Sequence, residues 1–330
     1  MPPPREHAGP GRIDPAPRRQ LDHDLLAQLT TRLTERDLWL LNLLHEHRVL
    51  TLPQITQLAF PSRRAAAHRL LTLYQHTAVD RFRPARPLGS APHHYLLGPA
   101  GAAVLSQRHD TDIGHRAEHV TALAHSAKLT HLVGCNGFFT ALIAHSRNTT
   151  ASPADGQSVL EQWWNEKRCA QSWGHTVQPD GYGRWRQSGR IVDFFLEYDT
   201  GSEPLARLTG KVHDYLELAD ATGIYHTAVL FALPSIRREH HLHDHLGHHG
   251  RSMPIPIATT NTALLTAHGP ARAIWQTLDN TSGDAEHRTA LIDLPISRSA
   301  ATTPPAHNST HPGDASAAGP GQATGRVMPR

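Results

Sequence analysis

An apolar run that ends in acidic residues constrains the fold of this chain more than any other stretch of its sequence. Residues 191–196 (Ile-Val-Asp-Phe-Phe-Leu) have the length and the β-branched and aromatic content of a short buried strand. Glu197 and Asp199 follow it, and residues two apart on a strand point to the same face. The sequence therefore predicts a buried strand that presents two carboxylates on one face of its end.

A third acid and a lysine accompany this strand. Asp180 begins the hairpin-like segment that leads into it, and Lys211 lies in the first turns of a helix expected over residues 204–221. Carboxylates that converge at strand ends suit Mg²⁺, and with a lysine they are the equipment for metal-assisted cleavage of a phosphodiester. We expect Asp180, Glu197 and Asp199 to hold the metal and Lys211 to orient water or neutralise the phosphate. The alternative is that Pro-Asp-Gly is only a turn and that the other acids form a solvated strand end.

The segment of residues 29–108 has the element order of a winged helix-turn-helix, which is three helices followed by a hairpin. Its expected elements are helices at 35–48, 52–59 and 63–74 and strands at 79–83 and 93–97. In that geometry the third helix enters the major groove of duplex DNA and the hairpin meets the backbone. The residues expected to contact DNA are Arg63, Arg64, His68, Arg69, Arg81, Arg83 and Arg86. A protein-interaction module with a solvated basic face is the alternative.

The whole chain is predicted to be α/β, or α+β overall, with two domains and two disordered ends. Its 330 residues are enough for two ordinary domains. We expect a disordered arm at 1–28 whose end, at 21–29, can be helical, then the winged helix-turn-helix at 29–108. An α/β domain at 109–296 and a disordered tail at 297–330 follow. In the α/β domain, a helix is expected over 115–133, with an interruption at 134–137, and a buried parallel strand over 227–233.

Composition indicates a soluble protein and draws attention to one lysine. No apolar stretch is long enough to cross a bilayer and the start has no apolar signal-peptide core, so we expect a cytoplasmic protein without a membrane partner. Two cysteines are too few for a disulfide framework. The formal net charge is +3, and lysine occurs only at positions 128, 167 and 211. The place of Lys211 near the acids is notable because lysine is so scarce.

The 27 histidines form two patterns that are associated with metals. His115 and His119 have the i, i+4 spacing of a zinc-binding pair, which we interpret as chance in so histidine-rich a chain. Residues 240–245 have the best chelating composition of the chain. This run predicts adventitious binding of Ni²⁺ or Zn²⁺ rather than a structural metal site.

The central motif resembles the replication-relaxation family, whose members belong to actinomycete plasmids and integrative elements and carry an N-terminal winged helix-turn-helix. The resemblance spans roughly residues 33–275. It rests on Pro179-Asp180-Gly181, on 194–203 (Phe-Phe-Leu-Glu-Tyr-Asp-Thr-Gly-Ser-Glu), on Lys211 and Tyr215, and on the strand at 229–231 with Leu233-Pro234. It implies a protein of plasmid or mobile-element replication or transfer that works on double-stranded DNA, with replication or transfer proteins as partners.

The second domain also looks like the PD-(D/E)xK nuclease fold, a restriction-endonuclease-like mixed sheet with flanking helices. Asp180 matches the Pro-Asp of that motif and Glu197 matches its second acid. The signature lysine is absent two residues after Glu197, where Asp199 stands, so Lys211 would be a relocated lysine. The resemblance leaves two interpretations open: a metal-dependent DNA endonuclease, or a non-catalytic DNA-binding replication or transcription factor with a degenerate nuclease domain. A protein-interaction adaptor is a third.

Overall fold

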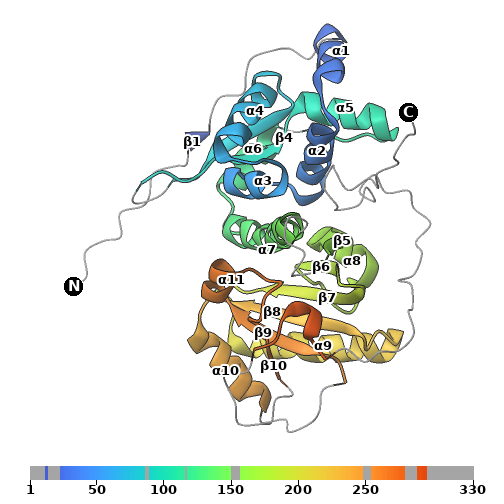
Figure 1. The fold of residues 1–330 in the computed structure, drawn as a ribbon, viewed down its shortest axis with the longest axis vertical. Helices are drawn as coiled ribbons and strands as arrows, with labels where there is room; N and C mark the ends of the chain where they lie inside the picture. The colour runs from blue at the N-terminus through green and yellow to red at the C-terminus, as the bar shows by residue number, and fades with distance from the viewer. Residues whose placement is uncertain are drawn as a thin grey trace, which may run out of the picture. The chain divides into compact units, whose positions relative to one another are not determined.

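The computed structural model describes residues 12–13, 23–85, 89–115, 117–149, 157–247, 254–278 and 288–295. The fold is mixed α/β, as predicted (Figure 1). The chain divides into two compact units between Asn136 and Gly137. The boundary expected from the sequence lies earlier, at 108/109. Within the described residues, no helix combines the length and the apolar composition needed to cross a membrane.

The first unit consists of helices and a small antiparallel sheet with the order β1-β3-β4-β2. Its helices are α1 (His23–Arg32), α2 (Glu35–His47), α3 (Leu52–Ala59), α4 (Arg63–Gln75), α5 (Pro99–His109) and α6 (Ala117–Ala124). Its strands are β1 (Arg12–Ile13), β2 (Leu50–Thr51), β3 (Val79–Arg83) and β4 (His94–Leu97). The three predicted helices and both hairpin strands are therefore confirmed as elements. The arm expected over 1–28 contains the start of α1, and the rest of that arm, apart from β1, lies outside the described residues, as does the predicted tail.

Capping side chains set where these helices begin. Thr34 accepts a hydrogen bond from the N–H of Asp37 at 3.3 Å, and Asp37 accepts one from the N–H of Thr34 at 2.8 Å. Thr51 and Gln54 form the same reciprocal pair at the start of α3, and Ser62 caps α4. Such caps satisfy backbone N–H groups that have no partner inside the helix, which is why the sequence located these starts well.

The helix predicted over 115–133 is broken at a place that the sequence did not indicate. The helix α6 ends at Ala124, and α7 (Leu129–Thr149) runs without a break through the Gly134–Gly137 stretch that was expected to interrupt it. The break at 125–128 is stabilised by Ser126, whose Oγ accepts from the N–H of Lys128 at 3.2 Å. Inside α7, the buried amide of Asn136 donates to the carbonyls of His47 and Val49 at 3.1 and 2.7 Å. These tertiary hydrogen bonds offset the cost of about 1 kcal/mol that each helical glycine carries.

The second unit is built on a mixed sheet with the order β10-β9-β8-β7-β6-β5 (Figure 1). Its strands are β5 (Ser158–Asn165), β6 (Gly181–Gln187), β7 (Arg190–Tyr198), β8 (Thr227–Leu233), β9 (Ile257–Asn261) and β10 (Gln276–Thr277). The strands β5, β6 and β7 form an antiparallel meander, and β7, β8 and β9 are parallel neighbours. The predicted strands at 191–196 and 227–233 are confirmed, and every residue of β8 is buried.

Helices cover both faces of this sheet. They are α8 (Glu166–Trp173), α9 (Leu205–Thr222), α10 (Ile236–Gly247), α11 (Thr262–His268) and the part of α7 that belongs to the second unit. The start of α8 is set by Asn165, whose side chain accepts a hydrogen bond from the N–H of Arg168.

Alternation along β7 decides which side chains meet which helix. Phe195 stacks on Tyr215 of α9 with ring centroids 5.2 Å apart, while Phe194 on the opposite face stacks on Phe139 of α7 at 6.0 Å. Gly183 of β6 makes room for Phe194, because a Cβ at this position would lie 2.3 Å from the ring. Glu197 lies on the Phe195 face, so the same alternation places its carboxylate under α9.

Candidate functional site

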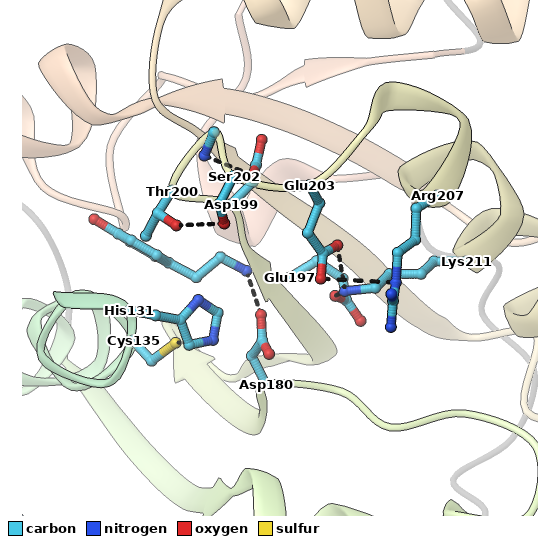
Figure 2. A network of polar contacts seen from close by, with 12 residues as sticks. His131, Cys135, Asp180, Glu197, Asp199, Thr200, Ser202, Glu203, Arg207 and Lys211 are labelled. Atoms are coloured by element: carbon cyan, nitrogen blue, oxygen red, sulfur yellow. Dashed lines mark hydrogen bonds and ion pairs between the residues drawn. The ribbon is translucent and has the colours of Figure 1, made fainter. Parts of the chain in front are cut away.

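The centre of the candidate site is the carboxylate of Glu197, which α9 encloses. Glu197 is 2% exposed. Lys211 Nζ donates to Glu197 Oε2 at 2.7 Å (Figure 2). The Tyr215 hydroxyl donates to Glu197 Oε1 at 2.5 Å. Lys211 and Tyr215 are four residues apart on α9 and therefore share one face of that helix. The expected meeting of Glu197 with Lys211 is present in the structure.

Asp180 reaches the same end of the sheet from the neighbouring strand. Its backbone N–H donates to the carbonyl of Leu196 at 3.1 Å, and its Oδ2 accepts from the N–H of Tyr198 at 2.7 Å (Figure 2). Because β6 and β7 are paired, this acid sits directly beside the end of β7 that carries Glu197. Its charge acts on both Glu197 and Lys211.

Burial and the closeness of several carboxylates shift the pKa values of Glu197 and Lys211. Burial, and next the charge of Asp180, raise the pKa of Glu197 to about 7, against the opposing effects of Lys211 and Tyr215. Burial lowers the pKa of Lys211, but the carboxylates of Glu197, Asp180 and Glu203 outweigh burial and raise it overall. Lys211 Nζ lies 3.5 Å from Glu203 Oε2. The ammonium is therefore surrounded by acids and stays charged.

Asp199 is held by a different set of donors. Its Oδ1 accepts from the N–H of Gly201 at 2.7 Å, and its Oδ2 accepts from Arg238 Nε on α10. The same guanidinium donates to the carbonyl of Glu203 at 2.5 Å. Gly201 has a φ of +85°, a conformation that favours glycine, so this loop takes a tight path. Asp199 and Arg238 together close the connection from β7 to α9.

The expected Mg²⁺ site can be tested against these donors. Mg²⁺ needs near-octahedral oxygen ligands at about 2.0–2.1 Å and keeps several waters. Both oxygens of Glu197 and both oxygens of Asp199 already accept a hydrogen bond, and each carboxylate faces its own cation, Lys211 or Arg238. The Glu197 side chain is 3% exposed, and Lys211 and Tyr215 already donate to its two oxygens. With Lys211 and Arg238 in these positions, the carboxylates of Glu197 and Asp199 do not fit Mg²⁺, so no metal-dependent step is assigned to this cluster.

A second buried glutamate in this unit was not found from the sequence. Glu239 of α10 is 0% exposed and pairs with Arg288, with N–O distances of 2.9 and 3.0 Å. Thr259 and Asn261 of β9 each donate to Glu239 at 2.9 Å. No local pattern connects these residues, because their meeting depends on the order of the strands. The roles of Tyr215 and Arg238 were missed as well, although the i, i+4 spacing of Lys211 and Tyr215 was a usable signal.

In the first unit, three of the residues expected to contact DNA lie on an open face of α4. Arg63, Arg64 and His68 are exposed. Leu71, which follows His68 on this face, is 41% exposed. The sequence of α4 contains no acidic residue.

Three of the other arginines expected to contact DNA have intramolecular contacts, and the fourth is not among the described residues. Arg69 pairs with the buried Asp37, with its Nη2 2.6 Å from Oδ2, and so joins α4 to α2. Arg81 stacks on the Tyr74 ring at 4.3 Å. Arg83 on β3 donates to the hydroxyl of Ser90 at 2.8 Å. Arg86 lies outside the described residues.

The two histidine patterns are separate from both regions. His115 Nε2 lies 2.9 Å from Asp80 Oδ2, which gives the imidazole a structural role in the first unit. In the run at 240–245, His243 contacts the Thr259 hydroxyl at 2.7 Å, and His240, His241 and His245 are exposed.

Comparison with known protein families identifies a match that covers both α4 and the candidate site. Residues 41–233, more than half of the chain, match the family model described as replication-relaxation. The matched range begins inside α2 and ends with β8, so it contains α4, Asp180 and the Glu197–Lys211 pair. No curated protein matches the chain.

Proposed function

The chain belongs to the replication-relaxation family, and on that premise we propose that it is a DNA-binding protein of plasmid or mobile-element replication or transfer. The first unit supplies the contact with duplex DNA, in the manner of a winged helix-turn-helix. The element order of α2, α3 and α4 followed by the β3–β4 hairpin supports this assignment.

The exposed face of α4 is the observation that carries the proposal. Arg63, Arg64 and His68 project from the start of a helix without acids, and the positive end of the helix dipole lies at the same place. Phosphate and the acceptor edges of guanine are the partners that such a surface attracts. In this proposal Arg81 and Arg83 lie along the hairpin that approaches the backbone, whereas Arg69 is a structural residue because Asp37 holds it.

The direct test is the binding of fluorescent duplex DNA to the full chain over a range of salt concentrations. Replacing Arg63 and Arg64 together with alanine should weaken binding and reduce the slope of log K against log salt by about 2, since each lost phosphate contact accounts for about 0.9. The matched control is R207A/R237A, which removes the same charge from exposed helix positions of the second unit. Equal affinities and slopes for both double variants and the wild type would overturn the proposal and favour a protein-interaction adaptor.

Cleavage of DNA is the competing function for the second unit, and one observation favours it. The meander β5–β7, the crossover α9 and the parallel strand β8 have the order expected of a PD-(D/E)xK nuclease, with Asp180 and Glu197 at the motif positions. The donors around Glu197 favour the alternative, a non-catalytic domain, and we adopt that alternative.

Incubation with supercoiled plasmid tests this choice. The full chain is incubated with Mg²⁺, with Mn²⁺ and with EDTA, beside the variants Asp180→Ala and Lys211→Ala. We expect salt-sensitive DNA binding without nicking in every arm. Nicking that requires metal and disappears in both variants would instead make the protein an endonuclease with a relocated lysine, and DNA binding by the first unit would be unaffected by that result.

A further inference from the structure

The ammonium of Lys211 occupies the centre of a group of carboxylates in the second unit. It lies 2.7 Å from Glu197 Oε2 and 3.5 Å from Glu203 Oε2, and the charge of Asp180 acts on it as well. Figure 2 shows the lysine side chain lying between Glu197 and Glu203. Only 25% of the Lys211 side chain is exposed, so bulk water does little to screen these interactions.

This environment is that of a bound cation. Acids from three elements (the start of β6, the end of β7 and the loop before α9) surround one positive charge, and an isolated buried carboxylate at Glu197 would be costly without it. Divalent metals that prefer oxygen ligands bind to clusters of carboxylates of the same kind. A metal ion and the ammonium would therefore compete for one place.

We propose that the Lys211 ammonium is the resident cation of the Asp180–Glu197–Glu203 carboxylate site and excludes divalent metal from it. The lysine side chain supplies from within the chain the positive charge that a metal would otherwise supply. Removing that charge converts the same carboxylates into a divalent-cation site. The inference concerns the second unit alone and stands or falls independently of DNA binding by α4.

The test measures Mn²⁺ binding to the full chain by the loss of the free Mn²⁺ signal in electron paramagnetic resonance. Wild type should show no binding that depends on Asp180, so wild type and Asp180→Asn should give the same titration. Lys211→Met keeps the apolar stem and removes the charge, and it should bind Mn²⁺ about tenfold or more tightly than wild type, because a like charge within a few ångströms has been removed. The gain should disappear in the double variant K211M/E197Q.

Arg207→Met is the matched control. It removes a positive charge from the same helix, where Arg207 is 71% exposed and lies 3.8 Å from Glu203. Because water screens this exposed charge, the change in Mn²⁺ affinity should be far smaller than for Lys211→Met. The exposed histidines of α10 are intact in all of these variants. Weak Mn²⁺ binding to these histidines is therefore the same in every variant and does not affect the comparison.

Two results would overturn the inference. One is Mn²⁺ binding by wild type that Asp180→Asn abolishes, since the site would then take metal with the lysine in place. The other is a folded Lys211→Met or Lys211→Gln variant that gains no Mn²⁺ affinity. If neither variant folds, the comparison of wild type with Asp180→Asn still decides the question.

Discussion

Two buried glutamates of the second unit have opposite electrostatic surroundings. Burial alone would raise the pKa of Glu239, but the hydrogen bonds and charge of Arg288, with those of Asn261 and Thr259, bring it below its usual value. Burial and the neighbouring Asp180 raise the pKa of Glu197 to about 7, against the opposing effect of Lys211.

The difference shows what a planar guanidinium does that an ammonium does not. Arg288 meets both oxygens of Glu239 at once, and two further donors complete the shell. Lys211 meets one oxygen of Glu197 and shares its charge with Glu203. The Glu239 cluster therefore holds the fold together, whereas the Glu197 cluster retains an excess of negative charge.

Breaking the Arg288 pair should produce the largest effect. Arg288→Met leaves Glu239 as a buried anion without its cation and should lower the free energy of unfolding by about 3–5 kcal/mol. Urea unfolding followed by tryptophan fluorescence measures this loss. The control is Arg190→Met, whose exposed pair with Asp293 should contribute less than about 1 kcal/mol. Similar losses in both variants would contradict the structural role of the Glu239 cluster.

The two glutamates can be compared directly by the same substitution. Glu239→Gln removes charged hydrogen bonds to Arg288 and should cost about 1.5–3 kcal/mol of unfolding free energy. Glu197→Gln should cost less than about 1 kcal/mol, because it relieves the charge crowding with Asp180 while Lys211 keeps Glu203 as a partner. Chemical denaturation of the two variants in parallel checks the ranking, and a larger loss for Glu197→Gln would reverse the comparison.

The pH dependence of stability should differ in sign between the two sites. The folded pKa of Glu197 is raised from 4.5 to about 7, so the folded state binds its proton more tightly, and this stabilisation is lost as pH rises from 4.5 through 7. The folded pKa of Glu239 is lowered from 4.5, so its stabilisation is present above 4.5 and is lost as pH falls through the folded value.

Unfolding free energies at several pH values, for wild type and each glutamine variant, measure these slopes. The difference between wild type and Glu197→Gln should change in favour of the variant between pH 5 and pH 8. The difference between wild type and Glu239→Gln should shrink as the pH is lowered from 6 to 3. Parallel slopes would show that the two carboxylates have equivalent surroundings.

The smallest effect is expected at the rim of the Glu197 cluster. Arg207→Met removes an exposed i, i+4 pair with Glu203 and should change the free energy of unfolding by about 0.3–0.5 kcal/mol. Thermal unfolding at low and high salt measures this contribution, which salt should reduce further. A change above about 1 kcal/mol would mean that Glu203 depends on Arg207 more than its exposure suggests.

Local patterns predicted the parts of the fold that depend on local physics. The strand at 191–196 and the buried strand β8 were found from apolar runs, and the starts of α2 and α4 from their capping residues. The continuation of α7 through 134–137 was not predicted, because the hydrogen bonds of Asn136 to the carbonyls of His47 and Val49 involve residues far apart in the chain.

In the candidate site, too, contacts set by local sequence were predicted and contacts set by strand order were not. The Glu197–Lys211 pair followed from strand alternation and from a helix that begins soon after the strand. The pairing of Arg238 with Asp199 and of Arg288 with Glu239 depends on which strands are neighbours, and no spacing in the sequence specifies that. Candidate acids could therefore be named from the sequence, but the cations that neutralise them could not.

The seclusion of Lys211 makes this chain easy to observe by isotope labelling. The only other lysines, Lys128 and Lys167, are exposed. Protein grown with ¹⁵N-lysine would carry three labelled side chains, and an ammonium proton resonance survives solvent exchange best where the group is enclosed and hydrogen-bonded. A single slowly exchanging Nζ resonance would then report on the carboxylate site in the intact protein, with no probe attached and no residue replaced.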